Sequence, residues 1–276
     1  MLIIMAACST APKETGDVYR LRKQAEAQIE IGNRETDRGG YNAALTMLDE
    51  AMRLAVITDD PGLRIRAGLS RGNVLFAMGR SGEAAECWNH ALSEAERAKM
   101  SELAAVCRIY IARGTLLSPD GKVHAQSVRD EVERNMAFIK SDRLYTAFAW
   151  IIAGLAEKEL NRYAQAEAAI RRSLEIHEKE HHLELAAYDW FLIASFRSLA
   201  ADYPGARQAL EMAMAFDRRV ENSWGLASDW RALGDVCRKA GDHDASRAAY
   251  LRAAGIYHAI GDTQAAEETL SRAESR

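Results

Sequence analysis

The sequence has few residues that interrupt helices and few patterns that mark strands. Only four prolines occur among its 276 residues, and proline is the residue that most strongly breaks a helix interior. Sustained runs of alternating apolar and polar residues are missing, as are Asn-Gly or Asp-Gly hairpin turns flanked by such runs. These absences argue against a β architecture and favour long, uninterrupted helices.

Cysteines, basic charge and long apolar runs are also scarce. The four cysteines (Cys8, Cys87, Cys107 and Cys237) include no pair with metal-ligand or redox spacing, which excludes zinc-ribbon and thioredoxin-like sites. The net charge of −4 gives no basic face for nucleic acid. After the first residues no run of 18 apolar residues could span a membrane. The chain is nevertheless 48% hydrophobic and 28% charged, which is typical of folded proteins.

Tryptophans recur with a fixed period in the second half of the chain. Trp150, Trp190 and Trp230 are forty residues apart. A small residue follows each tryptophan after four positions, a second small residue after sixteen, and a large residue after twenty. These residues are Gly154, Ala194 and Gly234, then Ala166, Ala206 and Ser246, then Ile170, Leu210 and Tyr250. A period of this size with fixed small and large positions indicates an array of helical repeats.

The first half follows the same plan less regularly. Gly32 and Gly72 hold the small position in repeats one and two, and Gly114 is expected to hold it in repeat three, with Gln126 at the packing position of its second helix. The repeat domain is predicted to cover 21–276. Hairpins are predicted near 25–60, 65–100, 102–140, 144–181, 184–220 and 224–260, and a capping helix over 263–276.

The pattern W-x-x-L-G…A-x-x-x-[FYLWI]…A resembles the tetratricopeptide repeat family, and Trp230-Arg231-Ala232-Leu233-Gly234 is its fullest copy. The resemblance covers residues 25–276. It implies an all-α, right-handed superhelical array, an α-solenoid, of about six hairpins plus a C-terminal cap. The residues expected to pack the repeats are Gly32, Gly72, Gly114, Trp150, Gly154, Trp190, Trp230 and Gly234.

The resemblance also implies a concave groove lined by the first helix of each hairpin. The residue after the small position points into this groove in the family. Those residues here are Asn33, Asn73, Thr115, Leu155, Ser195 and Asp235. Asn33 and Asn73 could each hydrogen-bond the backbone of an extended peptide, because an amide both donates and accepts. The alternative is that both are solvated helix residues.

Other positions in the groove register leave two alternatives open. Ile29, Leu69, Phe76, Phe148, Ile151, Tyr188 and Phe191 either form an exposed apolar patch that binds a partner or pack against neighbouring first helices. Arg231, Arg238 and Lys239 lie near Asp235 in the same register. These cations either meet an acidic segment of a partner or form a solvated face.

One sequence motif suggests chemistry that the rest of the chain does not support. His177-Glu178-Lys179-Glu180-His181 matches the zinc-peptidase pattern H-E-x-x-H. Its spacing would put both histidines on one helix face. However, the intervening residues are charged, and the run is expected to form the solvated end of a helix. The sequence therefore predicts no catalytic residue, no bound metal and no cofactor.

The N-terminus, Met1-Leu2-Ile3-Ile4-Met5-Ala6-Ala7-Cys8, resembles the lipobox of bacterial lipoproteins. This implies a signal remnant over 1–7, lipidation at Cys8 and a flexible tether over 8–20. Met5 stands where leucine is usual, and no Lys or Arg precedes Cys8. The alternative is a frayed apolar N-terminus of a cytoplasmic protein.

Together these observations predict a non-enzymatic scaffold that binds another protein through an extended segment or a helix. It would be held to a membrane by its lipid alone, on the periplasmic side of a bacterial envelope. The alternative is a cytoplasmic regulatory array that binds a regulator or a small ligand. The sequence names neither the partner nor the oligomeric state.

Overall fold

The computed structural model describes residues 16–37 and 39–274, and every regular element in these residues is an α-helix. The thirteen helices of this part of the chain are α1 (Asp17–Asp37), α2 (Tyr41–Ile57), α3 (Pro61–Ala77), α4 (Ser81–Arg97), α5 (Ser101–Leu116), α6 (Gly121–Met136), α7 (Arg143–Glu159), α8 (Tyr163–Lys179), α9 (Leu183–Leu199), α10 (Tyr203–Arg219), α11 (Ser223–Lys239), α12 (His243–Ala259) and α13 (Thr263–Glu274). The expected all-α solenoid class is confirmed.

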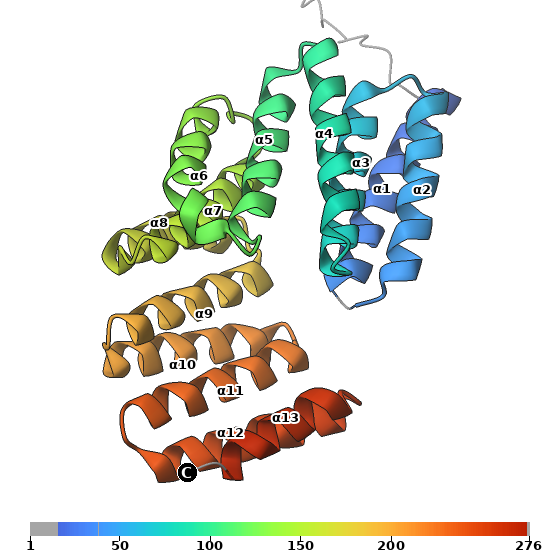
Figure 1. The fold of residues 1–276 in the computed structure, drawn as a ribbon. Helices are drawn as coiled ribbons and strands as arrows, with labels where there is room; N and C mark the ends of the chain where they lie inside the picture. Colours follow the sequence, from blue (N-terminus) through green and yellow to red (C-terminus); the bar gives the residue numbers. More distant parts are fainter. Residues whose placement is uncertain (1–15, 38, 275–276) are drawn as a thin grey trace, which may run out of the picture. The chain divides into compact units, whose positions relative to one another are not determined.

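The chain divides into two compact units whose boundary lies inside α5, between Cys107 and Arg108. Unit 1 contains α1 to α4 and the start of α5, and unit 2 contains the rest of α5 and α6 to α13. Within unit 2, Figure 1 shows α9, α10, α11 and α12 stacked in chain order, with α13 against α12. From α1 to α4 and from α6 to α13, consecutive helices pack on each other, so the core of each unit is a series of small layers.

Tight turns set the spacing of the helices. The residue after the C-cap of most helices adopts positive φ, as Gly79 (φ 76°) and Gly241 (φ 79°) do. Its neighbour closes the turn, since the backbone N–H of Arg80 donates to the carbonyl of Leu75 at 2.9 Å. An aspartate or asparagine often starts the next helix, as Asp242 does by accepting from the Ala245 N–H at 3.2 Å.

In four hairpins (α1–α2, α3–α4, α7–α8 and α11–α12) a glycine of the first helix faces a large side chain of the second. A Cβ on Gly32 would lie 2.9 Å from Leu48, and one on Gly154 would lie 2.8 Å from Ile170. On Gly234 it would lie 2.5 Å from the Tyr250 ring. Ordinary carbon contacts are about 3.5–4.0 Å, so these glycines allow the two helices to approach closely.

The register of the third hairpin differs from the prediction. Counted from the start of α5, Ala112 takes the place of Gly72 and Gly154, and it is buried, whereas Gly114 is partly exposed. In α6 the buried alanine is Ala125, and Gln126 is exposed. Helix α7 starts 42 residues after α5 instead of 40, and the two additional residues lie in the link 137–142 before α7. Counting back forty residues from Gly154 therefore placed the predicted small position of α5 two residues too late.

Two further boundaries need correction. The tether was expected to reach residue 20, but α1 begins at Asp17, whose carboxylate suits the first turn of a helix. The remaining tether residues before 16, the signal remnant 1–7 and Cys8 lie outside the described residues. Among the residues described, no helix is long and apolar enough to cross a membrane.

The predicted packing tryptophans are only partly buried. Trp150, Trp190 and Trp230 are of intermediate exposure, and the Trp190 and Trp230 rings pack against the core from its edge. The Arg252 guanidinium lies 4.7 Å from the Trp230 ring centroid. The fully buried tryptophan is Trp88 of α4, which is 1% exposed and faces Gly72.

Candidate functional site

The candidate groove residues of unit 1 fall into different environments. Asn33 is exposed, whereas Asn73 is partly buried and its Oδ1 accepts no hydrogen bond from the described residues. Phe76 is partly buried, 5.6 Å from the Trp88 ring. Ile29 and Leu69 are buried, so these two apolar positions pack inside unit 1 and are not part of an exposed patch.

Unit 2 presents large apolar side chains on the matching face of α7 and α9. Tyr188 is 47% exposed, and its ring lies 6.5 Å from that of Phe191 with the planes 12° apart. Phe148 lies 40 residues before Tyr188, in the same register, and stacks on Tyr110 at 4.4 Å. Ile151 lies one turn further along α7 and is partly exposed, as are Phe148 and Phe191. We call Phe148, Ile151, Tyr188 and Phe191 the aromatic face.

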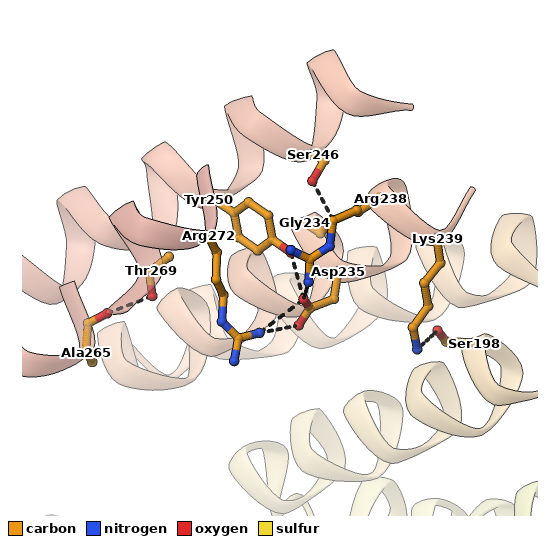
Figure 2. Close-up of polar contacts among 10 residues, drawn as sticks. All are labelled: Ser198, Gly234, Asp235, Arg238, Lys239, Ser246, Tyr250, Ala265, Thr269 and Arg272. Carbon is orange, nitrogen blue, oxygen red and sulfur yellow. Dashed lines mark hydrogen bonds and ion pairs between the residues drawn. The ribbon is translucent and has the colours of Figure 1, made fainter. Parts of the chain in front are cut away.

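On α11, the groove-facing positions carry polar side chains. Thr115, Leu155, Ser195 and Asp235 take the place after the predicted small residues, and all four are partly exposed. Figure 2 shows that Asp235 is held by side chains from three helices. The Tyr250 hydroxyl of α12 donates to Asp235 Oδ1 at 2.7 Å, and Arg238 Nη2 donates to the same oxygen at 3.0 Å. Arg272 Nη1 of α13 contacts both Asp235 oxygens at 3.1 and 3.2 Å.

Aromatic rings and burial fix this polar cluster further. The Arg238 guanidinium lies 5.5 Å from the Tyr250 ring centroid, and that of Arg231 lies 5.6 Å from the Tyr257 ring. Burial, followed by the hydrogen bond to Asp235, raises the pKa of Tyr250 to about 12. Lys239 is exposed and donates to Ser198 at 3.3 Å. We call Asp235, Arg238, Tyr250 and Arg272 the Asp235 cluster.

An open cavity of about 680 Å³ adjoins this cluster. Its walls include three arginines, Arg238, Arg247 and Arg272, and also two acidic residues, Asp244 and Glu274. Two of these guanidinium groups, those of Arg238 and Arg272, contact Asp235 at the end of the groove register. Guanidinium groups bind carboxylates in bidentate geometry, so this part of the surface is suited to an acidic group.

The histidines of the H-E-x-x-H motif are separated, and the expectation of a solvated run is wrong for His177. This residue is 2% exposed, and its Nδ1 lies 2.7 Å from Asp189 Oδ2. Ser173 Oγ donates to the other oxygen of Asp189 at 3.1 Å. Helix α8 ends at Lys179, so His181 lies in the following turn with φ 61° instead of on the same helix face.

The burial of Ser173, His177 and Asp189 indicates a structural role. Burial raises the pKa of Asp189, and the hydrogen bond with His177 opposes that rise. Ser173 and Asp189 are fully buried, so the three groups form a structural network between α8 and α9. The described residues include no group of three or more His, Cys, Asp or Glu side chains that could hold a metal.

His177 and Asp189 lie at positions that recur every forty residues and that the sequence motifs did not indicate. Where one hairpin packs on the next, two positions are buried at five junctions. They are the fifteenth residue in the second helix of one hairpin and the seventh residue in the helix that follows it. The pairs are Ala55 and Ala67, Asn135 and Ala149, His177 and Asp189, Asp217 and Asp229, and Tyr257 and Thr269. Reading the sequence in forty-residue columns would have shown polar residues recurring at 177, 217 and 257 and at 189, 229 and 269.

Comparisons with known proteins agree with this architecture. The sequence profile of the tetratricopeptide repeat matches residues 149–180, the hairpin of α7 and α8. The crystal structure of a Rap protein complexed with Competence and Sporulation Factor is similar, with a TM-score of 0.63 and 13% identity over 91% of this chain and 74% of that one. BtubC from P. vanneervenii is similar with a TM-score of 0.60 and 16% identity over 86% of this chain and 92% of its own.

A third similar structure is aspartyl phosphate phosphatase F from Bacillus subtilis, with a TM-score of 0.56 and 13% identity over 93% of this chain and 71% of that one. No curated protein sequence matches this chain. Identities this low establish the fold alone. The chain therefore has a helical-repeat fold, and one of its hairpins matches the tetratricopeptide repeat.

Proposed function

We propose that this protein is a non-enzymatic scaffold that binds a segment of a partner protein across α7, α9 and α11. The observation that carries the proposal is the exposure of Tyr188 within the aromatic face, next in register to the Asp235 cluster. Contiguous exposed apolar side chains favour a binding surface. The partner segment would place apolar residues on the aromatic face and an acidic residue near Arg238 and Arg272.

The fold and one similar structure support a binding role. Arrays of helical repeats commonly use an extended surface formed by their first helices. The similar Rap protein was crystallised with Competence and Sporulation Factor. In unit 1, Asn33 and Asn73 are proposed to hold backbone groups of the same or another segment, Asn73 with the buried Oδ1 that accepts no bond from the described residues.

Photocrosslinking of this protein to its partners in living cells tests the binding surface. A photoreactive phenylalanine analogue replaces Tyr188, and in a matched variant it replaces Leu251 of α12, which is 44% exposed. We expect a discrete crosslinked product from position 188 and none from position 251. Equal products from both positions, or none from 188, would contradict a binding surface at the aromatic face.

We further propose that the protein is a lipoprotein, lipidated at Cys8 and held at the periplasmic side of a bacterial envelope. The support is the sequence Ala6-Ala7-Cys8-Ser9 after an apolar start. The test is incorporation of labelled palmitate into the native protein and a Cys8→Ala variant, each expressed with its natural upstream sequence. Label in the native protein that disappears in the variant supports the anchor, and its absence from both refutes it.

A second candidate is a cytoplasmic regulatory array that binds a regulator or small ligand. The observation that favours it is the similarity to the Rap protein and to aspartyl phosphate phosphatase F, each over more than nine-tenths of this chain. Absence of palmitate label together with a soluble partner crosslinked at position 188 would favour this function over the lipoprotein.

A further inference from the structure

Two carboxyl groups meet at the buried junction between α10 and α11. Asp217 of α10 is 4% exposed and Asp229 of α11 is 2% exposed. They occupy the helix positions that bring His177 and Asp189 into contact one junction earlier, so the two carboxyl groups are placed to share a hydrogen bond. Two ionised carboxylates cannot donate to one another, so this contact requires a proton on one of them.

The surroundings favour Asp229 as the carrier of that proton and Asp217 as the hydrogen-bond acceptor. Asn222 Nδ2 donates to Asp217 Oδ1 at 3.0 Å, which favours a charged Asp217. Asp229 Oδ2 is buried and accepts no hydrogen bond from an N–H or O–H of the described residues. These surroundings favour a protonated Asp229 carboxyl as the donor to Asp217.

The chain around the pair is shaped to hold it. A Cβ on Gly225 would lie 2.2 Å from Asp217 Oδ2, so only glycine leaves room for this carboxyl group. The other charged groups that face the pair are Glu184 on α9 and Arg218 on α10. Glu184 disfavours a second negative charge at Asp217, and Arg218 favours the charged form of Asp229.

We propose that the α10–α11 junction is a proton-dependent joint, in which one proton shared by Asp217 and Asp229 keeps the α9–α10 hairpin packed on the α11–α12 hairpin. Loss of the proton places two negative charges in one buried site. Like charges at this distance repel strongly where water is excluded. The junction then opens, and water solvates both carboxylates.

The direction of the pH response follows from the proton balance. Burial is the largest cause that raises the pKa of Asp217 to about 6 and that of Asp229 to about 8. An aspartate in an unfolded or opened chain has a pKa near 3.9, so the packed junction binds more protons than the open one. The packing stabilisation is complete below about pH 4 and is lost as pH rises through 6 to 8.

The neighbouring junctions provide controls in the same column. His177 and Asp189 pair an imidazole with a carboxylate at 2.7 Å. Tyr257 and Thr269 carry hydroxyl groups in place of carboxyl groups, and Ala55 and Ala67 in unit 1 carry no titratable group. A response between pH 6 and 9 is therefore expected at α10 and α11 and not at α2 and α3.

Hydrogen exchange on the full-length protein between pH 5.5 and 9 tests the joint, after correction for the intrinsic rate at each pH. We expect protection of the amides at the α10–α11 junction to fall by at least about tenfold relative to those of α2 and α3. The Asp229→Asn variant should lose this fall. The matched Asp189→Asn variant should weaken the α8–α9 junction and keep the pH response at α10–α11.

A direct titration keeps the proposal testable if Asp229→Asn does not fold. In the native protein, carbon-13 NMR of the aspartate carboxyl carbons should show two groups with midpoints above pH 5.5. Titration of every aspartate below pH 5 would overturn the proposal. So would equal loss of protection at α10–α11 and α2–α3 as pH rises.

Discussion

Gly72→Ala should destabilise unit 1, although alanine is the better helix former. A Cβ at position 72 would lie 2.2 Å from Trp88 Nε1 and 2.5 Å from Cδ1. The ring is 1% exposed, and Nε1 donates to the Leu69 carbonyl at 3.3 Å, so the side chain cannot move out of the way without losing that bond. Overpacking of this kind costs about 1–3 kcal/mol, and the lost hydrogen bond about 1 kcal/mol.

Gly68→Ala is the matched control on the same helix. Its Cβ would lie 3.7 Å from Ala91, an ordinary contact. Both substitutions gain the helix propensity of alanine, about 1 kcal/mol, so this gain cancels in their difference. The Gly72 variant should therefore be about 2–4 kcal/mol less stable to unfolding than the Gly68 variant.

Urea unfolding followed by fluorine NMR of 5-fluorotryptophan measures this difference, because Trp88 is the only tryptophan in residues 1–107. Replacing Trp88 with leucine, the residue at the equivalent position 48, should recover part of the loss in a double variant with Gly72→Ala; because this variant lacks the Trp88 probe, its unfolding and that of Gly72→Ala are compared by circular dichroism. Equal stabilisation by both alanine substitutions would refute the close-approach account of the hairpin.

Other substitutions test the turns, the buried network and the Asp235 cluster. Ala201 adopts φ 62°, which is strained for a residue with a Cβ, so Ala201→Gly should stabilise the protein by about 1 kcal/mol. Gly241 adopts φ 79° at the equivalent position forty residues later, so Gly241→Ala should destabilise the protein by a similar amount. Melting temperatures of the two variants measure both effects. His177→Ala leaves the Asp189 carboxyl buried without its imidazole partner and should lower the free energy of unfolding in urea by about 3–5 kcal/mol. His181 is exposed, so His181→Ala should change this free energy by less than about 0.5 kcal/mol. Asp235→Asn breaks partly exposed ion pairs and should alter stability by less than about 1 kcal/mol, yet abolish the crosslink from position 188 if the cluster orients the partner's acidic residue.

The repeat period made the hairpins predictable because it fixes contacts inside each hairpin. A small residue and a large one sixteen positions later must meet for two short-linked helices to pack, as Gly154 and Ile170 do. The third hairpin was misaligned for a local reason. Gly114 and Gln126 fitted a shifted motif, while the residues buried instead, Ala112 and Ala125, are not distinctive in the sequence.

Exposure in the groove register could not be predicted from residue type. Leu69 and Tyr188 are both large and both lie on first helices, but Leu69 is buried and Tyr188 is half exposed. The difference depends on how closely successive first helices pack, which the forty-residue period does not encode. The burial of Asp217 and Asp229 was missed for another reason, since aspartate is rarely buried without a cation beside it.

Contacts inside hairpins and contacts between hairpins therefore rest on different chemistry. Inside four of the hairpins, glycine meets a large side chain, and this arrangement occurs in both units. Between hairpins, unit 1 uses Ala55 and Ala67, whereas unit 2 uses polar or titratable pairs at three successive junctions. Apolar contacts do not respond to pH, but a shared proton does. Any pH-driven change in the spacing of α9 and α11, and so in the surface formed by Phe191 and Asp235, should therefore arise at the Asp217–Asp229 junction while every hairpin stays intact.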